Sequence, residues 1–158
     1  MADGKEGYAA VIASPVGRLG IRAHEALTCI DFVSARVPLA PPRTPLARQV
    51  CAQLKAYFAN PRTRFDLPLA AHGTEFQQRA WRALQRIPSG RVRTYGELAR
   101  TLKSAPRAVG GACRANPIPI IVPCHRVVAA SGPGGFMGAT RGRAMDIKRW
   151  LLAHEAAD

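Results

Sequence analysis

The sequence predicts a mixed α/β (α+β) fold of two lobes: a small β-sheet with one helix over residues 1–72, and a mostly helical lobe over residues 73–158. Three observations support this prediction. The length of 158 residues is sufficient for a hydrophobic core without disulfides or metals. Strand-like segments separated by turn residues occupy the first part of the chain. Capped segments with apolar residues at helical spacing occupy the second part.

The first lobe begins with a predicted β-hairpin. Residues 8–14 and 19–23 flank Pro15-Val16-Gly17, whose proline and glycine are typical of a turn. The apolar residues of segment 26–33 predict a third strand. Residues 65–69 are a further candidate strand of the same sheet.

A helix is predicted between these strands. Thr44 fits an N-cap and Pro45 fits the first helical position, and the helix is expected to run to about Asn60. Its apolar stripe consists of Val50, Leu54, Tyr57 and Phe58.

The second lobe is predicted to contain several helices. Thr74 fits the cap of a helix that ends near Ile87, before Pro88-Ser89-Gly90. The apolar face of this helix consists of Phe76, Ala80, Trp81, Leu84 and Ile87. Thr94 and Glu97 then fit a capping box, in which both side chains satisfy backbone N–H groups at a helix start.

Two short helices, over about 95–103 and 106–115, lie in a basic context and suggest a helix-turn-helix. This signal is weak by itself, because many helical hairpins bind no nucleic acid. The second helix contains Gly110 and Gly111, and each glycine costs roughly 1 kcal/mol relative to alanine. Two such glycines suggest that the helix backbone approaches a partner closely. Close packing against another helix is the alternative.

The charge of the chain is strongly positive. It has 23 Lys and Arg against 10 Asp and Glu, a formal net charge of +13. Residues 1–72 hold 9 basic and 5 acidic residues, whereas residues 73–158 hold 14 and 5, so most of the excess belongs to the second lobe. This excess suggests a polyanionic partner, most simply nucleic acid. A GC-rich coding sequence would also enrich arginine, without a functional cause.

The sequence shows no signal for secretion or membrane insertion. Its start lacks the apolar segment of a signal peptide, and no apolar run approaches ~18 residues. The cysteines form no CxxC pair and are expected to be free thiols, with a structural zinc or a disulfide as alternatives. They are Cys29, Cys51, Cys113 and Cys124.

A candidate nucleophile follows the apolar, proline-broken segment 118–122, in the sequence Pro123-Cys124-His125-Arg126-Val127. A thiol beside an imidazole and a guanidinium can have a lowered pKa, and the thiolate is the nucleophile. Adjacent side chains usually point apart, so Cys124 and His125 need a tight local turn to cooperate. From the residues alone, an inert core cysteine is the alternative.

These five residues are also the signature of the O6-alkylguanine-DNA alkyltransferases, and the chain resembles this family over about residues 73–156. The other matching motifs are Phe76-Gln-Gln-Arg-Ala-Trp81, Tyr95, Arg107-Ala-Val-Gly-Gly-Ala112, Asn116-Pro117, residues 132–136 and Lys148-Arg-Trp-Leu-Leu-Ala-His-Glu155. Residues 1–72 match more loosely, through Ser14-Pro-Val-Gly17 and the helix before Asn60. For them the resemblance implies a ribonuclease H-like lobe.

The resemblance implies a DNA repair methyltransferase. Cys124 would accept the alkyl group of O6-alkylguanine, or of O4-methylthymine, in one irreversible displacement. His125 would ionise Cys124 through a water molecule, and Glu155 would orient His125. Asn116 would brace the turn that brings Cys124 and His125 together. Tyr95 would donate a proton to guanine N3.

The resemblance also implies binding of duplex DNA without sequence preference. The helix-turn-helix would dock in the minor groove, and Arg107 would enter the duplex in place of the extruded nucleotide. Gly110 and Gly111 would let the helix approach the groove. The residues expected at the DNA are Arg107, Ala108, Gly110, Gly111, Arg114 and Arg126. For Arg126 a structural role is the alternative.

The base pocket is expected at Tyr95, Val127, Phe136, Met137 and Gly138. The main-chain carbonyls of Cys124 and Val127 would receive the exocyclic amine of guanine. Phe136 stands where many relatives have tyrosine, and Met137 is the alternative occupant of that place. Gly138 keeps one glycine of a usual pair. Cys113 stands where a larger apolar side chain is frequent.

No cofactor and no metal are expected, because the zinc ligands of some relatives are not evident among Cys29, Cys51, His24 and His72. We expect a monomer without a membrane partner, in the cytoplasm of a bacterial or archaeal cell. Other classes are a lesion-binding relative without the acceptor cysteine, a transcription regulator, and a thiol hydrolase or redox enzyme. Cys124 argues against the first. The others lack a visible dimer interface, effector domain or resolving cysteine.

Overall fold

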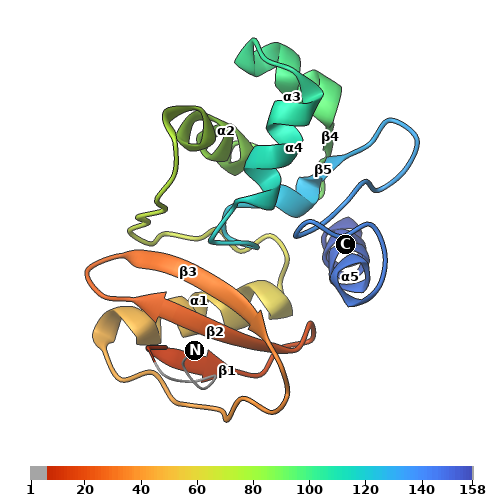
Figure 1. The fold of residues 1–158 in the computed structure, drawn as a ribbon. Helices are drawn as coiled ribbons and strands as arrows, with labels where there is room; N and C mark the ends of the chain where they lie inside the picture. Colours follow the sequence, from red (N-terminus) through yellow and green to blue (C-terminus); the bar gives the residue numbers. More distant parts are fainter. Residues whose placement is uncertain (1–6, 158) are drawn as a thin grey trace. The chain divides into compact units, whose positions relative to one another are not determined.

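The computed structural model describes residues 7–157 and divides into two compact units, residues 1–72 and 73–158 (Figure 1). Within the described residues, the first unit contains a three-stranded sheet and one α-helix, and the second contains four α-helices, one short 3-10 helix and a two-stranded sheet. This content confirms the mixed α/β class. The chain start, where no secretory signal is expected, lies outside the described residues.

The first unit is built on an antiparallel sheet of β1 (Ala10–Ile12), β2 (Arg18–Ala23) and β3 (Leu27–Val33), in the order β1-β2-β3. The predicted turn joins β1 to β2. Its backbone closes with a hydrogen bond of 3.1 Å from Gly17 N to Ser14 O, and Gly17 has a φ of 99°, which glycine adopts without strain.

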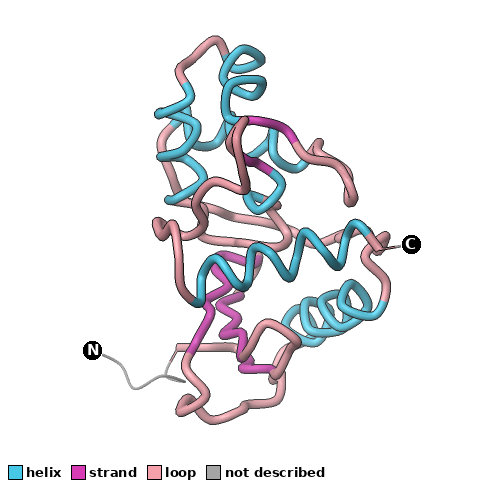
Figure 2. Tube along the Cα trace, turned by 90° about the vertical axis from the view of Figure 1, so that its right-hand side faces the viewer, coloured by secondary structure: helices cyan, strands magenta, loops and turns pink. Residues whose placement is uncertain are grey.

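Helix α1 (Pro45–Ala59) lies on one side of this sheet and packs against β1 and β2 (Figure 2). The Thr44 side chain caps it by accepting from Ala47 N at 3.1 Å, as expected from Thr44-Pro45. The buried residues of the helix are Ala47, Val50, Cys51, Leu54 and Tyr57. Segment 65–69 forms a single parallel bridge between Leu69 and Leu27 instead of a strand. Only this one residue pair reaches β3 in register.

The second unit begins with α2 (Glu75–Gln85), followed by β4 (Arg93–Thr94) and α3 (Tyr95–Leu102). Both helices start with a complete capping box, formed by Thr74 with Gln77 and by Thr94 with Glu97. Each box satisfies backbone N–H groups that have no partner inside the helix.

Helix α4 (Pro106–Arg114) follows α3 after a tight turn and packs against both α2 and α3. Lys103 ends α3 in the left-handed region, with φ 54°, and Ser104 N donates to Ala99 O at 2.9 Å. The buried indole of Trp81 donates to Ala112 O at 2.8 Å and ties α2 to α4. The arrangement of α3 and α4 is therefore a helix-turn-helix supported from behind by α2.

The chain then runs through the buried segment 118–122 into a 3-10 helix, η1 (Cys124–Arg126), and β5 (Val127–Val128). Strand β5 pairs in parallel with β4, with Arg93 opposite Val127. Two strands of two residues carry no periodicity, so the sequence did not predict this pairing. Helix α5 (Arg143–Ala156) ends the unit and packs against η1. Among the described residues, no helix is long and apolar enough to cross a membrane.

The cap of α3 is expected to contribute measurably to stability. Thr94→Ala removes the side-chain acceptor for Glu97 N, now at 3.0 Å. The free energy of unfolding should fall by about 1 kcal/mol. Denaturant unfolding measures this change. Ser131→Ala, in an exposed loop, is the control and should have no comparable effect. Equal stability of both variants would contradict a stabilising role for the cap.

Candidate active site

The turn between α4 and η1 is held by Asn116. Its buried amide Nδ2 donates to Val122 O at 2.8 Å, and its Oδ1 accepts from Ile118 N at 3.0 Å. These two bonds close segment 118–122, in which Ile120 has a φ of 75°. Asn116 thus lies where the sequence places it, at the turn that leads into the candidate nucleophile.

Cys124 and His125 occupy successive positions of η1. The short helix is closed by hydrogen bonds from Cys124 N to Val122 O at 2.8 Å and from Arg126 N to Pro123 O at 3.0 Å. Cys124 is only 3% exposed and His125 is fully buried. Cys124 and His125 therefore lie in a tight turn of the backbone.

The thiol of Cys124 is held in its neutral form. Burial raises the pKa of Cys124, and a hydrogen bond from the Asn116 side chain and the charge of Lys148 offset this rise only in part. A buried thiol of this kind becomes a nucleophile only when a base removes its proton.

His125 is connected to the C-terminal helix through Glu155. The distance from His125 Nε2 to Glu155 Oε2 is 2.8 Å, and both side chains are buried. Burial raises the pKa of Glu155, but hydrogen bonds from His125 and Arg126 outweigh burial and bring it well below its ordinary value. Glu155 is therefore ionised, so Nε2 carries the ring proton that it donates.

The other ring nitrogen of His125 can accept a proton. Burial lowers the pKa of His125, which keeps the imidazole neutral, although Glu155 opposes this effect in part. Nδ1 is buried and has no hydrogen-bond partner among the described residues. A neutral imidazole with an unpartnered Nδ1, in the residue that follows Cys124, has the properties of a general base.

Arg126 is part of the protein interior. Its Nε donates to Glu155 Oε1 at 2.8 Å, its Nη2 to Glu155 Oε2 at 2.9 Å and its Nη1 to Ile87 O at 2.6 Å. Arg126 is 8% exposed. This corrects the expectation of a phosphate contact, because the guanidinium is already engaged within the protein. The structural alternative describes it.

Lys148 belongs to the motif of residues 148–155, for which the sequence alone predicts no role at this position. Its buried Nζ donates to Val127 O at 2.7 Å and to Gly135 O at 2.8 Å, and it lies 6.0 Å from the centre of the Tyr95 ring. The ammonium thus joins β5 to the loop after it. A lysine between Met145 and Leu151 on the buried face of the helix is the signal that could have indicated this role.

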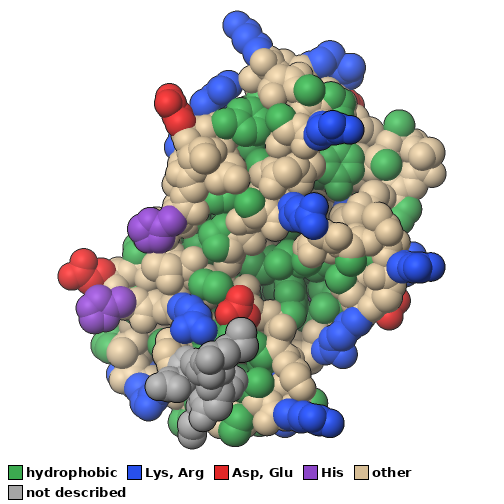
Figure 3. All heavy atoms as spheres, in the orientation of Figure 1, with side chains coloured by type: hydrophobic (Ala, Val, Ile, Leu, Met, Phe, Trp, Pro, Cys, Tyr) green, Lys and Arg blue, Asp and Glu red, His purple; other side chains and the backbone are tan. Residues whose placement is uncertain are grey.

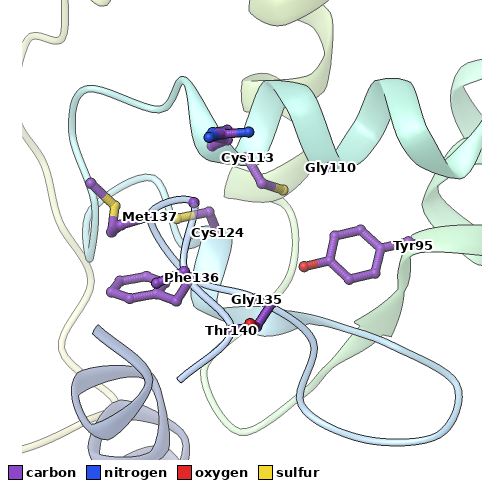
Figure 4. A pocket seen from close by; sticks show the side chains of 11 residues that line it. Tyr95, Gly110, Cys113, Cys124, Gly135, Phe136, Met137 and Thr140 are labelled. Atoms are coloured by element: carbon purple, nitrogen blue, oxygen red, sulfur yellow. The ribbon is translucent and has the colours of Figure 1, made fainter. Parts of the chain in front are cut away.

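A pocket of about 220 Å³ opens above Cys124 (Figure 4). Tyr95, at the start of α3, points its hydroxyl into this space, and Cys113 of α4 projects into it as well. Burial raises the pKa of Tyr95 to about 12, with a smaller effect of the nearby thiols. The residues that line the pocket are Tyr95, Gly110, Cys113, Arg114, Cys124 and residues 135–140.

Three of the expected pocket residues, Phe136, Met137 and Gly138, form one turn at the pocket. Hydrogen bonds join Phe136 N to Ala139 O at 2.8 Å and Ala139 N to Phe136 O at 2.9 Å. Met137 and Gly138 between them have φ values of 52° and 82°, as in a type I′ turn. Phe136 is buried, whereas Met137 is 39% exposed. Both side chains line the pocket, so neither replaces the other.

Val127 differs from the expectation. Its side chain is buried away from the pocket lining, and its carbonyl accepts a hydrogen bond from Lys148. Only the second lone pair of this oxygen is left for an incoming amine.

The expected DNA-contacting residues of α4 lie on its outer side. Arg107 and Gly111 are exposed, Ala108 and Gly110 are partly exposed, and Arg114 is exposed at the end of the helix. A Cβ added to Gly110 or Gly111 would meet no atom within 4 Å. Close packing against another helix within the described chain therefore does not explain these glycines. Figure 3 shows Lys and Arg side chains spread over the part of the molecule that holds α3 and α4.

The remaining candidates from the sequence are the cysteines and histidines considered as disulfide partners or zinc ligands. The four cysteines are free thiols. Within residues 7–157, no three His, Cys, Asp or Glu side chains come together as metal ligands would.

Comparisons with known proteins agree with this architecture. The chain matches the family model of the 6-O-methylguanine DNA methyltransferase DNA-binding domain over residues 75–157 and that of its ribonuclease-like domain over residues 8–71. The crystal structure of Mycobacterium tuberculosis O6-methylguanine methyltransferase matches with a TM-score of 0.78 and 40% identity, over 92% of this chain and 90% of that one.

Two further relatives extend the likeness. The methylated-DNA–protein-cysteine methyltransferase of Methanosarcina acetivorans is 40% identical over 95% of this chain and 99% of its own. A structure of Mycobacterium tuberculosis OGT in complex with DNA matches with a TM-score of 0.76 and 41% identity, over 92% of this chain and 91% of that one. The chain belongs to the 6-O-methylguanine DNA methyltransferase family.

The carboxylate of Glu155 is expected to be essential for stability. Glu155→Gln leaves the Arg126 guanidinium buried without its anionic partner, which costs about 3–5 kcal/mol of unfolding free energy near neutral pH. Because the pKa of Glu155 is lowered by folding, its contribution is present above its ordinary value of 4.5 and is lost as the pH falls further. The stability difference between wild type and variant should therefore shrink in acid, as measured by urea unfolding across pH.

A second carboxylate on the same helix serves as the control. Asp146 pairs with Arg149 at 3.4 Å, and both side chains are largely exposed. Asp146→Asn should change the unfolding free energy by less than about 1 kcal/mol. Equal effects of the two substitutions would contradict a special role for the buried carboxylate.

Proposed function

We propose that the second unit both binds damaged DNA and carries out the repair, with Cys124 as the acceptor of an alkyl group from guanine O6. The observation that supports this most directly is a buried Cys124 in the lining of a pocket beside a helix-turn-helix, followed directly in the chain by His125, which is bonded to Glu155. A lesion-binding protein or a transcription regulator needs no such arrangement.

Ionisation of the thiol is the first chemical step. A water molecule between Sγ of Cys124 and the unpartnered Nδ1 of His125 would carry the proton to the imidazole. The imidazolium is then stabilised by the ionised carboxylate of Glu155, 2.8 Å from Nε2. The lowered pKa of His125 keeps the base unprotonated until the thiol supplies its proton.

Displacement follows at the alkyl carbon. The sulfur–carbon bond forms while the carbon–O6 bond breaks, and the electron pair of the broken bond stays on the purine. Tyr95 remains protonated at neutral pH, since its pKa lies near 12, so its hydroxyl is available to donate a proton to guanine N3. Proton donation to a leaving group in the transition state increases the rate.

The lesion must leave the base stack before it reaches Cys124. Extruding a nucleotide costs a few kcal/mol, and a side chain inserted from the minor groove can hold the gap open. The exposed Arg107 at the start of α4 is suited to this role. The open space at Gly110 and Gly111 lets the backbone of α4 approach a narrow groove.

The product is a thioether, which does not revert to the thiol. We therefore propose that each molecule acts once, as a monomer, on O6-alkylguanine in duplex DNA of any sequence. O4-methylthymine presents the same oxygen–methyl bond and is included. The charge excess of residues 73–158 supplies the sequence-independent attraction to phosphates.

Transfer should be visible as a covalent change. A duplex with one O6-methylguanine is incubated with the protein, and the intact mass is measured. We expect a gain of one methyl group per molecule, on the peptide that contains Cys124. Cys51→Ser removes a buried thiol of the first unit and should still gain the methyl group, whereas Cys124→Ser should not. Binding of the duplex without any mass gain would refute transfer.

If Arg107 fills the gap left by the extruded nucleotide, its removal slows transfer from duplex DNA but not from a free base. Arg107→Ala should slow methyl transfer from duplex DNA by about 10-fold or more, because the cost of extrusion is no longer offset. Its reaction with free O6-benzylguanine requires no extrusion and should be nearly unchanged. Arg82→Ala, an exposed arginine of α2, is the control. Equal losses on both substrates would count against an inserted side chain.

A further inference from the structure

The carboxylate of Glu155 is shared between two neighbouring residues of η1. Its Oε2 accepts from His125 Nε2 at 2.8 Å and from Arg126 Nη2 at 2.9 Å, and its Oε1 accepts from Arg126 Nε at 2.8 Å. The two bonds from Arg126 are the parallel pair that a guanidinium makes with a carboxylate, and they fix the plane of both groups. Arg126 is itself anchored, because its Nη1 donates to Ile87 O at 2.6 Å. Arg126 therefore fixes the carboxylate that holds the His125 ring.

The His125 ring is under the influence of charges of both signs. Among the described residues, these charges are the Glu155 carboxylate and the Lys148 ammonium of α5, and the Arg126 guanidinium of η1. Helix α2, which also packs against η1, adds no further one. Cys124, the residue before His125, is a neutral thiol. Burial is the main cause that lowers the pKa of His125. Glu155 opposes this effect, whereas Arg126 and Lys148 strengthen it, Arg126 more than Lys148.

An extra proton on the pair of His125 and Glu155 would disable the base wherever it binds. One proton lies between Nε2 and Oε2, which are 2.8 Å apart. If the pair takes up a second proton, either the imidazole is doubly protonated, or the carboxylic acid donates to Nε2 and the ring proton moves to Nδ1. Nδ1 carries a proton in both cases and cannot accept one from a thiol. A positive charge bonded to both carboxylate oxygens disfavours this uptake.

We propose that Arg126 is a positioning residue for alkyl transfer, which binds both oxygens of Glu155 and thereby limits the pair of His125 and Glu155 to a single proton. Nδ1 of the imidazole then stays available for the proton of the acceptor thiol. This inference rests on the proposed function and concerns the base of that same site. The thiol proton passes to Nδ1, and the proton between Nε2 and Oε2 stays in place. Arg126 transfers no proton, because a guanidinium keeps its protons in proteins.

The test is the pH dependence of methyl transfer. The single-turnover rate is measured with the full chain in saturating excess over a duplex that holds one O6-methylguanine. Wild type should keep its rate down to a pH below 6.5, the ordinary pKa of histidine, because the pKa of His125 is lowered. Arg126→Gln keeps a donor near Glu155 but removes the charge. In mild acid its rate should fall about 10-fold further below its alkaline plateau than the rate of wild type does.

Two matched variants separate charge from structure. Arg126→Lys keeps the positive charge, although it lacks the planar fork, and should retain the pH dependence of wild type. Arg149→Gln removes an exposed arginine of the helix that carries Glu155 and should leave the pH dependence unchanged. A merely structural role of Arg126 predicts a different pattern for Arg126→Gln: the same fractional loss at every pH, in proportion to the unfolded fraction seen by near-UV circular dichroism.

A measurement on wild type does not depend on the folding of any variant. Nitrogen NMR spectra of histidine-labelled protein near neutral pH should show His125 protonated at Nε2 alone. A doubly protonated ring, or a proton on Nδ1, would overturn the inference.

The outcomes distinguish the role of Arg126 from the repair reaction itself. Methyl transfer by wild type, together with an unshifted acid limb in Arg126→Gln, would overturn the inference and leave the proposed function intact. An acid limb that shifts equally in Arg126→Lys and Arg126→Gln would also overturn it, because the charge would then not be the cause. Failure of methyl transfer by wild type would overturn the proposed function, and this inference with it.

Discussion

The second unit depends on the hydrogen bonds that the buried carboxylate of Glu155 accepts. This carboxylate receives donors from His125 and Arg126 at 2.8–2.9 Å and thereby joins the last helix to η1. Through Arg126 and Ile87 O, the same network reaches the segment that follows α2. An ionised carboxylate in the interior is tolerated only with such partners. One carboxylate therefore both holds the His125 ring and links η1, α5 and the segment that contains Ile87.

Local signals in the sequence predicted most helix starts. Thr44, Thr74 and Thr94 all cap as expected, because a cap depends on residues within one turn of the chain. The pairing of β4 with β5 could not be predicted, since two residues show no periodicity and their partners lie far apart in sequence. Segment 65–69 forms only the bridge between Leu69 and Leu27 and not the predicted strand.

The geometry of the candidate site was predictable where a short motif fixes it. It was not predictable where it depends on contacts between residues far apart in the sequence. Asn116 and the adjacency of Cys124 and His125 belong to one local turn. Arg126 was ambiguous, because its partner Glu155 is 29 positions away. Lys148 gained a role only once the carbonyls of Val127 and Gly135 were placed around its ammonium. The sequence left open whether Gly110 and Gly111 pack against another helix, because the answer depends on the atoms around them in the fold.

The neutral, enclosed thiol of Cys124 has a consequence for the cell's supply of this protein. If each molecule acts once, repair capacity equals the number of unspent copies, and every stray reaction with a circulating electrophile or oxidant subtracts one. Such reagents attack thiolates far faster than thiols. Burial raises the pKa of Cys124 and keeps it in the thiol form. In a protein that acts once, this slows the side reactions that would use up the acceptor before it meets a lesion.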